Sequence, residues 1–183
     1  MQINVSQLLK APIGSTREFS LDDPLAILDG GPEKPVTGDV SLIKTHRGIL
    51  AKGQVETVVP LECSRCLKTF KNKLTVNIEE EYFPSLDVNS GTPLELPDEP
   101  DGFTIDEHHI LDLSEAIRQN ALLAIPMKPL CREDCAGLCP VCGKDLNKEQ
   151  CGCDKGNIDP RWMKLADLAS ASKKNTKRKK EAE

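Results

Sequence analysis

The sequence predicts an α+β protein, in which an antiparallel β-sheet carries one central helix and is followed by a Cys-rich C-terminal module. Residues 36–82 alternate apolar and polar side chains with the period of two that half-buried strands show. Residues 112–125 carry apolar side chains at helical spacing, and six of the eight cysteines lie from Cys131 to Cys153. We expect a sheet-and-helix domain, a Cys-rich module packed on it, and a short helix with a basic tail, at residues 1–126, 127–160 and 161–183.

The first 35 residues contain a short apolar segment, Ile3 to Leu9, followed by closely spaced prolines and glycines. Breakers at this density favour extended segments and turns that pack against another part of the protein. We assign no chemistry to this region.

From Val36 onward, apolar side chains recur at alternate positions and predict the strands of the sheet. The first strand would bury Val36, Val40 and Leu42, and after a turn over residues 45–48 the next would bury Ile49, Ala51, Val55 and Val59. The clearest strand spans Thr69–Tyr82, and its apolar face comprises Phe70, Leu74, Val76, Ile78 and Tyr82. Its other face is polar, which indicates one packed and one solvated side of the sheet. A long loop should follow over residues 84–102.

A helix is predicted after this loop. Asp112 suits the N-cap position and Glu115 the third helical position, as in a capping box. The buried stripe of the helix would comprise Leu113, Ala116, Ile117, Ala121, Ala124 and Ile125. Pro126 ends the helix, so the chain passes directly to Cys131.

The cysteines are spaced as metal ligands. Cys63 and Cys66 form one Cys-x2-Cys pair, Cys139 and Cys142 form another, and the other four cysteines flank the second pair. Such a pair places two sulfurs of one turn on the same ion, and four thiolates are the usual ligands of structural zinc. Gly143 supplies the positive φ that such a zinc knuckle often needs. We predict two four-cysteine zinc sites, whose ligands are Cys63, Cys66, Cys131, Cys135, Cys139, Cys142, Cys151 and Cys153.

Three other uses of the cysteines compete with zinc. Structural disulfides need an oxidising compartment, and the N-terminal MQINVSQLLK has no apolar segment of a secretion signal. A redox-active Cys-x2-Cys pair would leave six cysteines unexplained. The spacing Cys135-x3-Cys139-x2-Cys142 matches the iron-sulfur motif of radical enzymes, which also need a large barrel domain. These considerations favour zinc as the ion that the cysteines bind. No apolar run approaches the length of a membrane span, so we expect a cytoplasmic protein.

The division of the cysteines between two ions rests on loop closure. Shorter loops cost less entropy to close, which favours ligands that are near in sequence. The favoured sets are Cys63/Cys66/Cys131/Cys135 and Cys139/Cys142/Cys151/Cys153. The first of these sets would join the two halves of the chain. An alternative places the two Cys-x2-Cys pairs on one ion, as zinc ribbons do, and the four remaining cysteines on the other.

The net charge of −5 conceals a separation of charge along the chain. Residues 77–115 hold twelve Asp and Glu and no Lys or Arg, whereas residues 161–183 hold eight Lys and Arg and three acids. Asp159 and Pro160 predict the start of a short helix. The Lys-rich segment after Ser170 is suited to the neutralisation of phosphates.

Several motifs together resemble those of one family. They are CSRCLKTF in mid-chain, CREDCAGLCPVCGKDLN, the closing Cys-x-Cys, DPRW, and the opening VSQLLKAPIGSTREF. In these the sequence resembles the YceD family of large ribosomal RNA subunit accumulation proteins, over nearly all of the chain except the Lys-rich tail. The resemblance implies a role in the accumulation of large-subunit ribosomal RNA and supplies no catalytic residues. Some members lack most of the downstream cysteines, which implies that the metal supports the fold.

If the protein binds RNA, its contacts should be to phosphates. Six aromatic residues in 183 are too few for a platform on which bases stack. The candidate phosphate-binding residues are Arg65, Lys68, Lys71, Lys73, Arg132, Lys144, Lys148, Lys173, Lys174, Lys177, Arg178, Lys179 and Lys180. We expect salt-sensitive binding with little sequence preference.

The residues do not indicate an enzyme. Four thiolates close the coordination sphere of an ion and leave no position for substrate or water. The sequence shows neither a phosphate-binding glycine loop nor a nucleophile with its base. We therefore expect a zinc-binding ribosome biogenesis factor that binds large-subunit ribosomal RNA, its precursor or the pre-50S particle.

Two other functions compete with this one. The first is an adaptor that holds a basic ribosomal protein through the acidic middle of the chain. The second is a zinc-ribbon DNA regulator, which would need a recognition helix with several basic residues, and none is visible.

Overall fold

The computed structural model describes residues 1–94 and 102–153. The chain forms two compact units, Met1–Cys135 and Ala136–Glu183, and the second is described as far as Cys153. The strands and helices named below all belong to the first unit. No helix among the described residues is long and apolar enough to cross a membrane.

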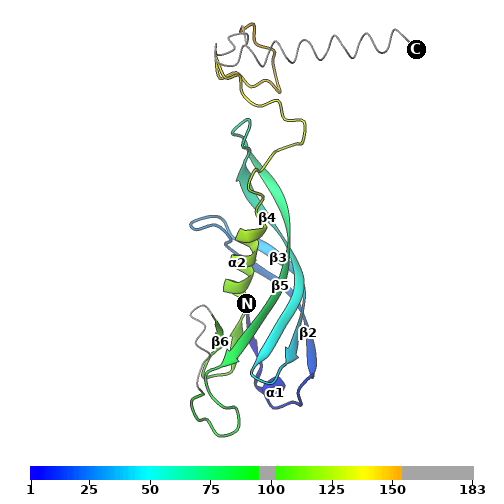
Figure 1. The fold of residues 1–183 in the computed structure, drawn as a ribbon, viewed down its shortest axis with the longest axis vertical. Helices are drawn as coiled ribbons and strands as arrows, with labels where there is room; N and C mark the ends of the chain where they lie inside the picture. The colour runs from blue at the N-terminus through cyan, green and yellow to red at the C-terminus, as the bar shows by residue number, and fades with distance from the viewer. Residues whose placement is uncertain (95–101, 154–183) are drawn as a thin grey trace, which may run out of the picture. The chain divides into compact units, whose positions relative to one another are not determined.

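The first unit is built on a five-stranded sheet in the order β2-β3-β4-β5-β6 (Figure 1). The strands are β2 (Thr16–Leu25), β3 (Lys34–Lys44), β4 (Ile49–Glu62), β5 (Thr69–Pro84) and β6 (Phe103–Ile105). Neighbours from β2 to β5 are antiparallel, which confirms the predicted antiparallel sheet. The short β6 pairs parallel to β5, so the sheet is mixed at this edge, which the sequence did not predict.

β4 and β5 form one long hairpin that positions the first pair of cysteines. Their register runs from Ile49 opposite Tyr82 to Glu62 opposite Thr69. Side chains of the inner face are buried, as the alternation predicts, and comprise Ile49, Ala51, Val55, Thr57, Val59, Leu61, Leu74, Val76, Ile78 and Tyr82. Because the alternation continues to the last paired residues, Cys63 follows on the inner face at the tip of the hairpin.

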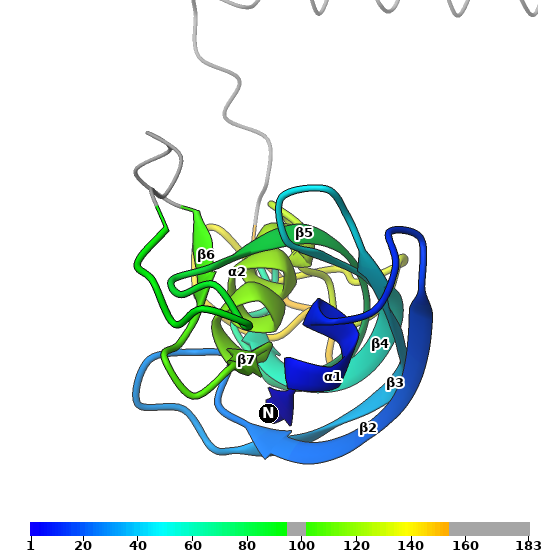
Figure 2. The ribbon, with the colours of Figure 1, turned by 90° about the horizontal axis from the view of Figure 1, so that it is seen from below.

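The core lies between the sheet and helix α2 (Ser114–Ala124). Figure 2 shows the sheet curved around this helix and around the short helix α1 (Ser6–Leu9). The helix buries Ala116, Ile117 and Ala121, and the Asp112 carboxylate accepts a hydrogen bond of 2.9 Å from the Ser114 amide. Ala124 is exposed, whereas Ile125 is partly buried against the core, so the predicted stripe is wrong only at Ala124. Because α1 is a second helix, the expectation of one helix is not confirmed.

The N-terminal residues take a larger part in the fold than the sequence predicted. β1 (Gln2–Asn4) pairs antiparallel with β7 (Ile110–Asp112), immediately before α2. β2 is an edge strand that pairs along its whole length with β3. Its Pro24 is compatible with this position, because an edge strand has one side on which no ladder hydrogen bond is needed.

Two glycines allow close approach in the middle of the sheet. Gly38 lies opposite Val55, and Gly53 lies opposite Val40. A Cβ atom at Gly38 would overlap the backbone of Gln54 and Val55, and one at Gly53 would overlap the backbone that faces it. These positions therefore require glycine, and they allow the sheet to curve over the helices.

Candidate metal centre

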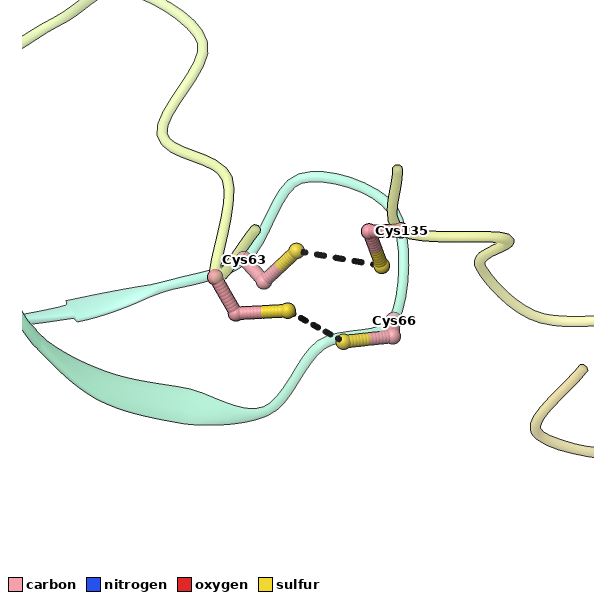
Figure 3. A group of neighbouring side chains, drawn as sticks. Cys63, Cys66 and Cys135 are labelled. Atoms are coloured by element: carbon pink, nitrogen blue, oxygen red, sulfur yellow. Dashed lines mark hydrogen bonds between the residues drawn. The ribbon is translucent and has the colours of Figure 1, made fainter. Parts of the chain in front are cut away.

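The first cysteine cluster joins the tip of the β4–β5 hairpin to the segment after α2. Figure 3 shows the sulfur of Cys63 turned toward that of Cys135, and the sulfur of Cys66 pointing into the same cluster. The fourth member is Cys131, and the four sulfurs all lie within 4.8 Å of one another. The Sγ–Sγ distances are 3.8 Å for Cys63 and Cys135 and 3.7 Å for Cys66 and Cys131.

These distances fit a metal site better than a disulfide. A disulfide would bring two sulfurs to about 2.05 Å, and all eight cysteines are free. Four sulfurs at about 2.3 Å around one tetrahedral ion lie about 3.8 Å from one another. The two Sγ–Sγ distances of 3.8 and 3.7 Å agree with such an edge. The cluster can therefore hold one metal ion with four thiolates.

The second cluster lies in the second unit. Its members are Cys139, Cys142, Cys151 and Cys153, whose sulfurs also lie within 4.8 Å of one another. Cys139 is buried and Cys142 is exposed. The amides of Cys142 and Val141 lower the pKa of Cys139 to about 6, and the neighbouring Cys142 side chain raises the pKa of Cys153 to about 12. The structure thus has the two sets that loop closure favours, and not the pairing of the two Cys-x2-Cys pairs.

In the first cluster, too, one cysteine has a lowered pKa and another a raised pKa. The amide of Cys131, followed by those of Cys66 and Arg65, lowers the pKa of Cys63 to about 6. Burial raises the pKa of Cys131 to about 12. Backbone donors thus stabilise the Cys63 thiolate, whereas the charged form of Cys131 needs a cation to stabilise it.

Both Cys-x2-Cys pairs adopt the same backbone turn. The amide of the first cysteine donates to the last carbonyl of the turn, at 2.9 Å in Cys63–Lys68 and 2.8 Å in Cys139–Lys144. The residue after the second cysteine is left-handed, with φ of 59° at Leu67 and 71° at Gly143. Glycine adopts this conformation freely, whereas a branched side chain makes it costly. Leu67 is also 59% exposed, so it gains little burial in return.

Hydrogen bonds reinforce the first cluster. The amide and hydroxyl of Ser64 donate to the Pro129 carbonyl at 2.9 and 2.8 Å. The Arg65 guanidinium donates to the carbonyls of Glu133 and Cys135 at 3.3 and 2.8 Å. Arg65, a predicted phosphate contact, thus joins the hairpin tip to the segment that carries the downstream ligands. Sequence analysis missed this role, because nothing local to Arg65 identifies its carbonyl partners.

The other predicted phosphate contacts fall into four groups. Lys68, Lys71 and Lys73 are exposed on or beside the hairpin tip. Arg132 forms an ion pair of 3.3 Å with Asp134, and in the second unit Lys144 forms one of 3.8 Å with Glu149. Lys148 is exposed in the second unit. The remaining candidates lie outside the described residues, and are Lys173, Lys174, Lys177, Arg178, Lys179 and Lys180.

Paired Cys→Ser substitutions distinguish the observed sets from the zinc-ribbon alternative. Substitution of Cys63 and Cys135 together should remove one of two bound metal equivalents, because both belong to the first cluster. Substitution of Cys63 and Cys139 together should remove both equivalents. Mass spectrometry of the metal content of the purified full chain measures these losses. The reverse pattern would show that the two Cys-x2-Cys pairs share an ion.

The left-handed backbone at Leu67 gives a second prediction. Leu67→Gly should raise the free energy of unfolding of the metal-loaded protein by about 1 kcal/mol, because it relieves backbone strain. Thr69→Gly is the matched control, since Thr69 is exposed in an extended strand and should be destabilised by glycine. Urea unfolding followed by circular dichroism measures both. A loss of stability in Leu67→Gly equal to that of the control would contradict the account of the knuckle.

The chain is similar in sequence to one family model and to several known proteins. The family model described as large ribosomal RNA subunit accumulation protein YceD matches residues 51–169, which include all eight cysteines. An uncharacterized protein of Mycobacterium tuberculosis is 34% identical over 131 residues, 71% of this chain and 60% of the relative. An Arabidopsis thaliana protein, named large ribosomal RNA subunit accumulation protein YCED homolog 1, chloroplastic, is 28% identical over 162 residues, 73% of this chain and 48% of the relative.

The matches to relatives cover only part of each relative's length. The chain spans about 60% of the length of the mycobacterial relative. No solved structure matches the chain. The family model nevertheless covers residues 51–169, more than half of the 183 residues, and the mycobacterial match exceeds two thirds of the chain. The chain therefore belongs to the YceD family of large ribosomal RNA subunit accumulation proteins.

Proposed function

We propose that the protein is a zinc-binding ribosome biogenesis factor that promotes accumulation of large-subunit ribosomal RNA by binding it or the pre-50S particle in the cytoplasm. The family description supports the link to ribosomal RNA. Two clusters of four cysteines support zinc, because zinc is commonly held by four thiolates in closed structural sites. In this proposal the metal shapes the protein, and side chains outside the clusters bind the RNA.

The chemistry of the clusters supports a structural role for the metal. Four cysteine ligands complete a tetrahedral sphere, so water or substrate has no free position on the ion. The first cluster is also largely closed to solvent, since Cys63, Cys66 and Cys135 are buried. We accordingly propose that the protein is not an enzyme.

The observation that carries the RNA proposal is the uncompensated charge of Lys71 and Lys73. Both are exposed on the outer face of β5, where their partners across the hairpin are Pro60 and Val58. Neither lysine has an ion pair within residues 1–94 and 102–153. Further along the same face, Lys52 lies opposite Glu79 and pairs with it at 3.1 Å. Among the described residues, the outer face thus has cations without an ion pair toward its cysteine end, which suits phosphate binding.

The alternative function, an adaptor that holds a basic ribosomal protein, would use acids at positions 79–81 and 98–101, and the first three already have partners within the chain. Glu79 pairs with Lys52, and Glu81 pairs with Arg47 at 3.2 Å. Glu80 accepts a hydrogen bond of 3.0 Å from Asn120. These three acids are therefore already occupied within the chain. The other acids of that surface, at positions 98–101, lie outside the described residues.

Substitution of Lys71 and Lys73 by Gln tests the proposal. Binding of the full chain to transcribed segments of large-subunit ribosomal RNA should weaken similarly for all segments. The slope of log affinity against log salt should fall by about 1.5, because two phosphate contacts are lost. Lys52→Gln is the control and should change neither quantity. Fluorescence anisotropy across a salt titration measures both.

Two results would contradict the proposal. An affinity that stays constant across the salt titration would exclude phosphate contacts. Equal effects of the Lys71/Lys73 and Lys52 variants would place the RNA elsewhere. If substitution of Glu79, Glu80 and Glu81 by Gln instead abolished capture of a basic ribosomal protein, the adaptor function would replace the one proposed.

A further inference from the structure

A cavity of about 420 Å³ lies at the end of the sheet opposite the cysteine cluster. The β3–β4 turn forms one wall, and the end of β5 with the loop after it forms another. Leu9 of α1 contributes to the lining, and Figure 1 shows α1 at this end of the sheet. The volume falls in the range of about 300–1,000 Å³ that small-molecule sites occupy.

The basic wall of the cavity comes from the end of β3 and the turn that follows it. Lys44, His46 and Arg47 all line it. Arg47 lies 5.3 Å above the centre of the Phe83 ring and pairs with Glu81 at 3.2 Å, so its charge is partly compensated. The rest of the lining is mainly apolar, and includes Leu9, Phe83, Pro84, Leu86, Val88 and Leu94.

Lys44 lies on the inner face of β3, where the neighbouring side chains are apolar. In β3, Val40 and Leu42 are buried on the inner face, and Lys44 follows at the next inward position. It is half-buried, and burial lowers its pKa. None of the carboxylates that the structure describes lies within ion-pair distance of its ammonium. A cation that is partly withdrawn from water without a counter-charge favours an anionic partner.

Asp87, the acid that lines the cavity, does not supply this partner. One of its carboxylate oxygens accepts hydrogen bonds from the amides of Asn89 and Ser90, at 3.0 and 2.7 Å, and from the Ser90 hydroxyl at 2.8 Å. These bonds lower its pKa and hold the loop in a turn. Asp87 is thus committed to the loop, and the charge of Lys44 remains available.

We propose that this cavity binds an organic phosphate monoester of nucleotide size, with Lys44 as the principal cation and the apolar lining against the organic group. A phosphate monoester carries a charge of about −1.5 to −2 at neutral pH and has three acceptor oxygens. Lys44, His46 and Arg47 all line the cavity and carry donors for these oxygens. The ligand is either a free mononucleotide or the 5′-phosphorylated end of an RNA chain. The site does not depend on RNA binding by Lys71 and Lys73.

Calorimetric titration of the full protein with adenosine 5′-monophosphate tests the proposal. The nucleotide should bind, and the affinity for adenosine should be lower by at least about tenfold, because adenosine lacks the charge-assisted hydrogen bonds. Lys44→Met should weaken nucleotide binding by about tenfold for the same reason. Lys52→Met is the matched control, since Lys52 lies on the outer face, and should bind as the unmodified protein does.

A second variant keeps the test valid if Lys44→Met is unstable. Leu94→Trp adds bulk to a partly exposed lining position, retains Lys44, and should also abolish binding. Absence of saturable binding at millimolar nucleotide, equal binding of adenosine, or full binding by both variants would overturn the proposal. The Lys71/Lys73 variant should retain nucleotide binding, and a matching loss there would place the nucleotide on the proposed RNA surface instead.

Competition distinguishes the two sources of the phosphate. Short RNAs with a 5′-phosphate should displace the nucleotide, and the same RNAs with a 5′-hydroxyl should not, if the ligand is a chain end. If neither RNA displaces it, the ligand is a free nucleotide. Displacement by both RNAs alike would contradict recognition of a terminal phosphate in this cavity.

Discussion

The sharing of four sulfurs between the β4–β5 hairpin tip and the segment after α2 is the constraint on which that end of the first unit depends. Cys63, Cys66 and Cys135 pack in a small cluster separate from the main core, with only Phe70, Leu130 and Cys131 against it. So few apolar contacts cannot by themselves fix the hairpin tip to the segment after α2. Structural zinc contributes about 10–16 kcal/mol of binding free energy in small peptides, enough to replace a missing core.

This cysteine cluster links the proposed metal to the proposed RNA surface without placing the metal in contact with RNA. Lys71 and Lys73 lie on the strand that leaves the hairpin tip, and Ser64 and Arg65 bind the tip to the downstream segment. In the proposed function, loss of an ion shared by the four sulfurs would release the tip beside these lysines, whose pairing in the β4–β5 ladder would remain. The other end of the sheet carries the phosphate cavity around Lys44, so the two basic regions lie at opposite ends of the hairpin strands.

The features that the sequence predicted are those with local signals. Cys-x2-Cys spacing identified both knuckles, and alternation identified β5, because each depends on residues a few positions apart. β2 was missed because its breakers and acids mask the alternation of Phe19, Leu21 and Leu25. The role of Lys44 could not be found from sequence, because its cavity is assembled from three separate segments. Its significance also depends on the lack of a counter-charge among residues 1–94 and 102–153, which only the structure shows.

X-ray absorption spectroscopy of the purified full chain at the zinc edge tests the central claim most directly, because it reports the ligand atoms and their distances. The account requires four sulfur ligands at about 2.3 Å for the bound ions and no nitrogen or oxygen in the coordination shell. At the iron edge, by contrast, iron–sulfur distances with a second iron shell would indicate an iron–sulfur cluster. Mixed ligands or an absence of zinc would contradict the closed four-thiolate sites on which the account rests.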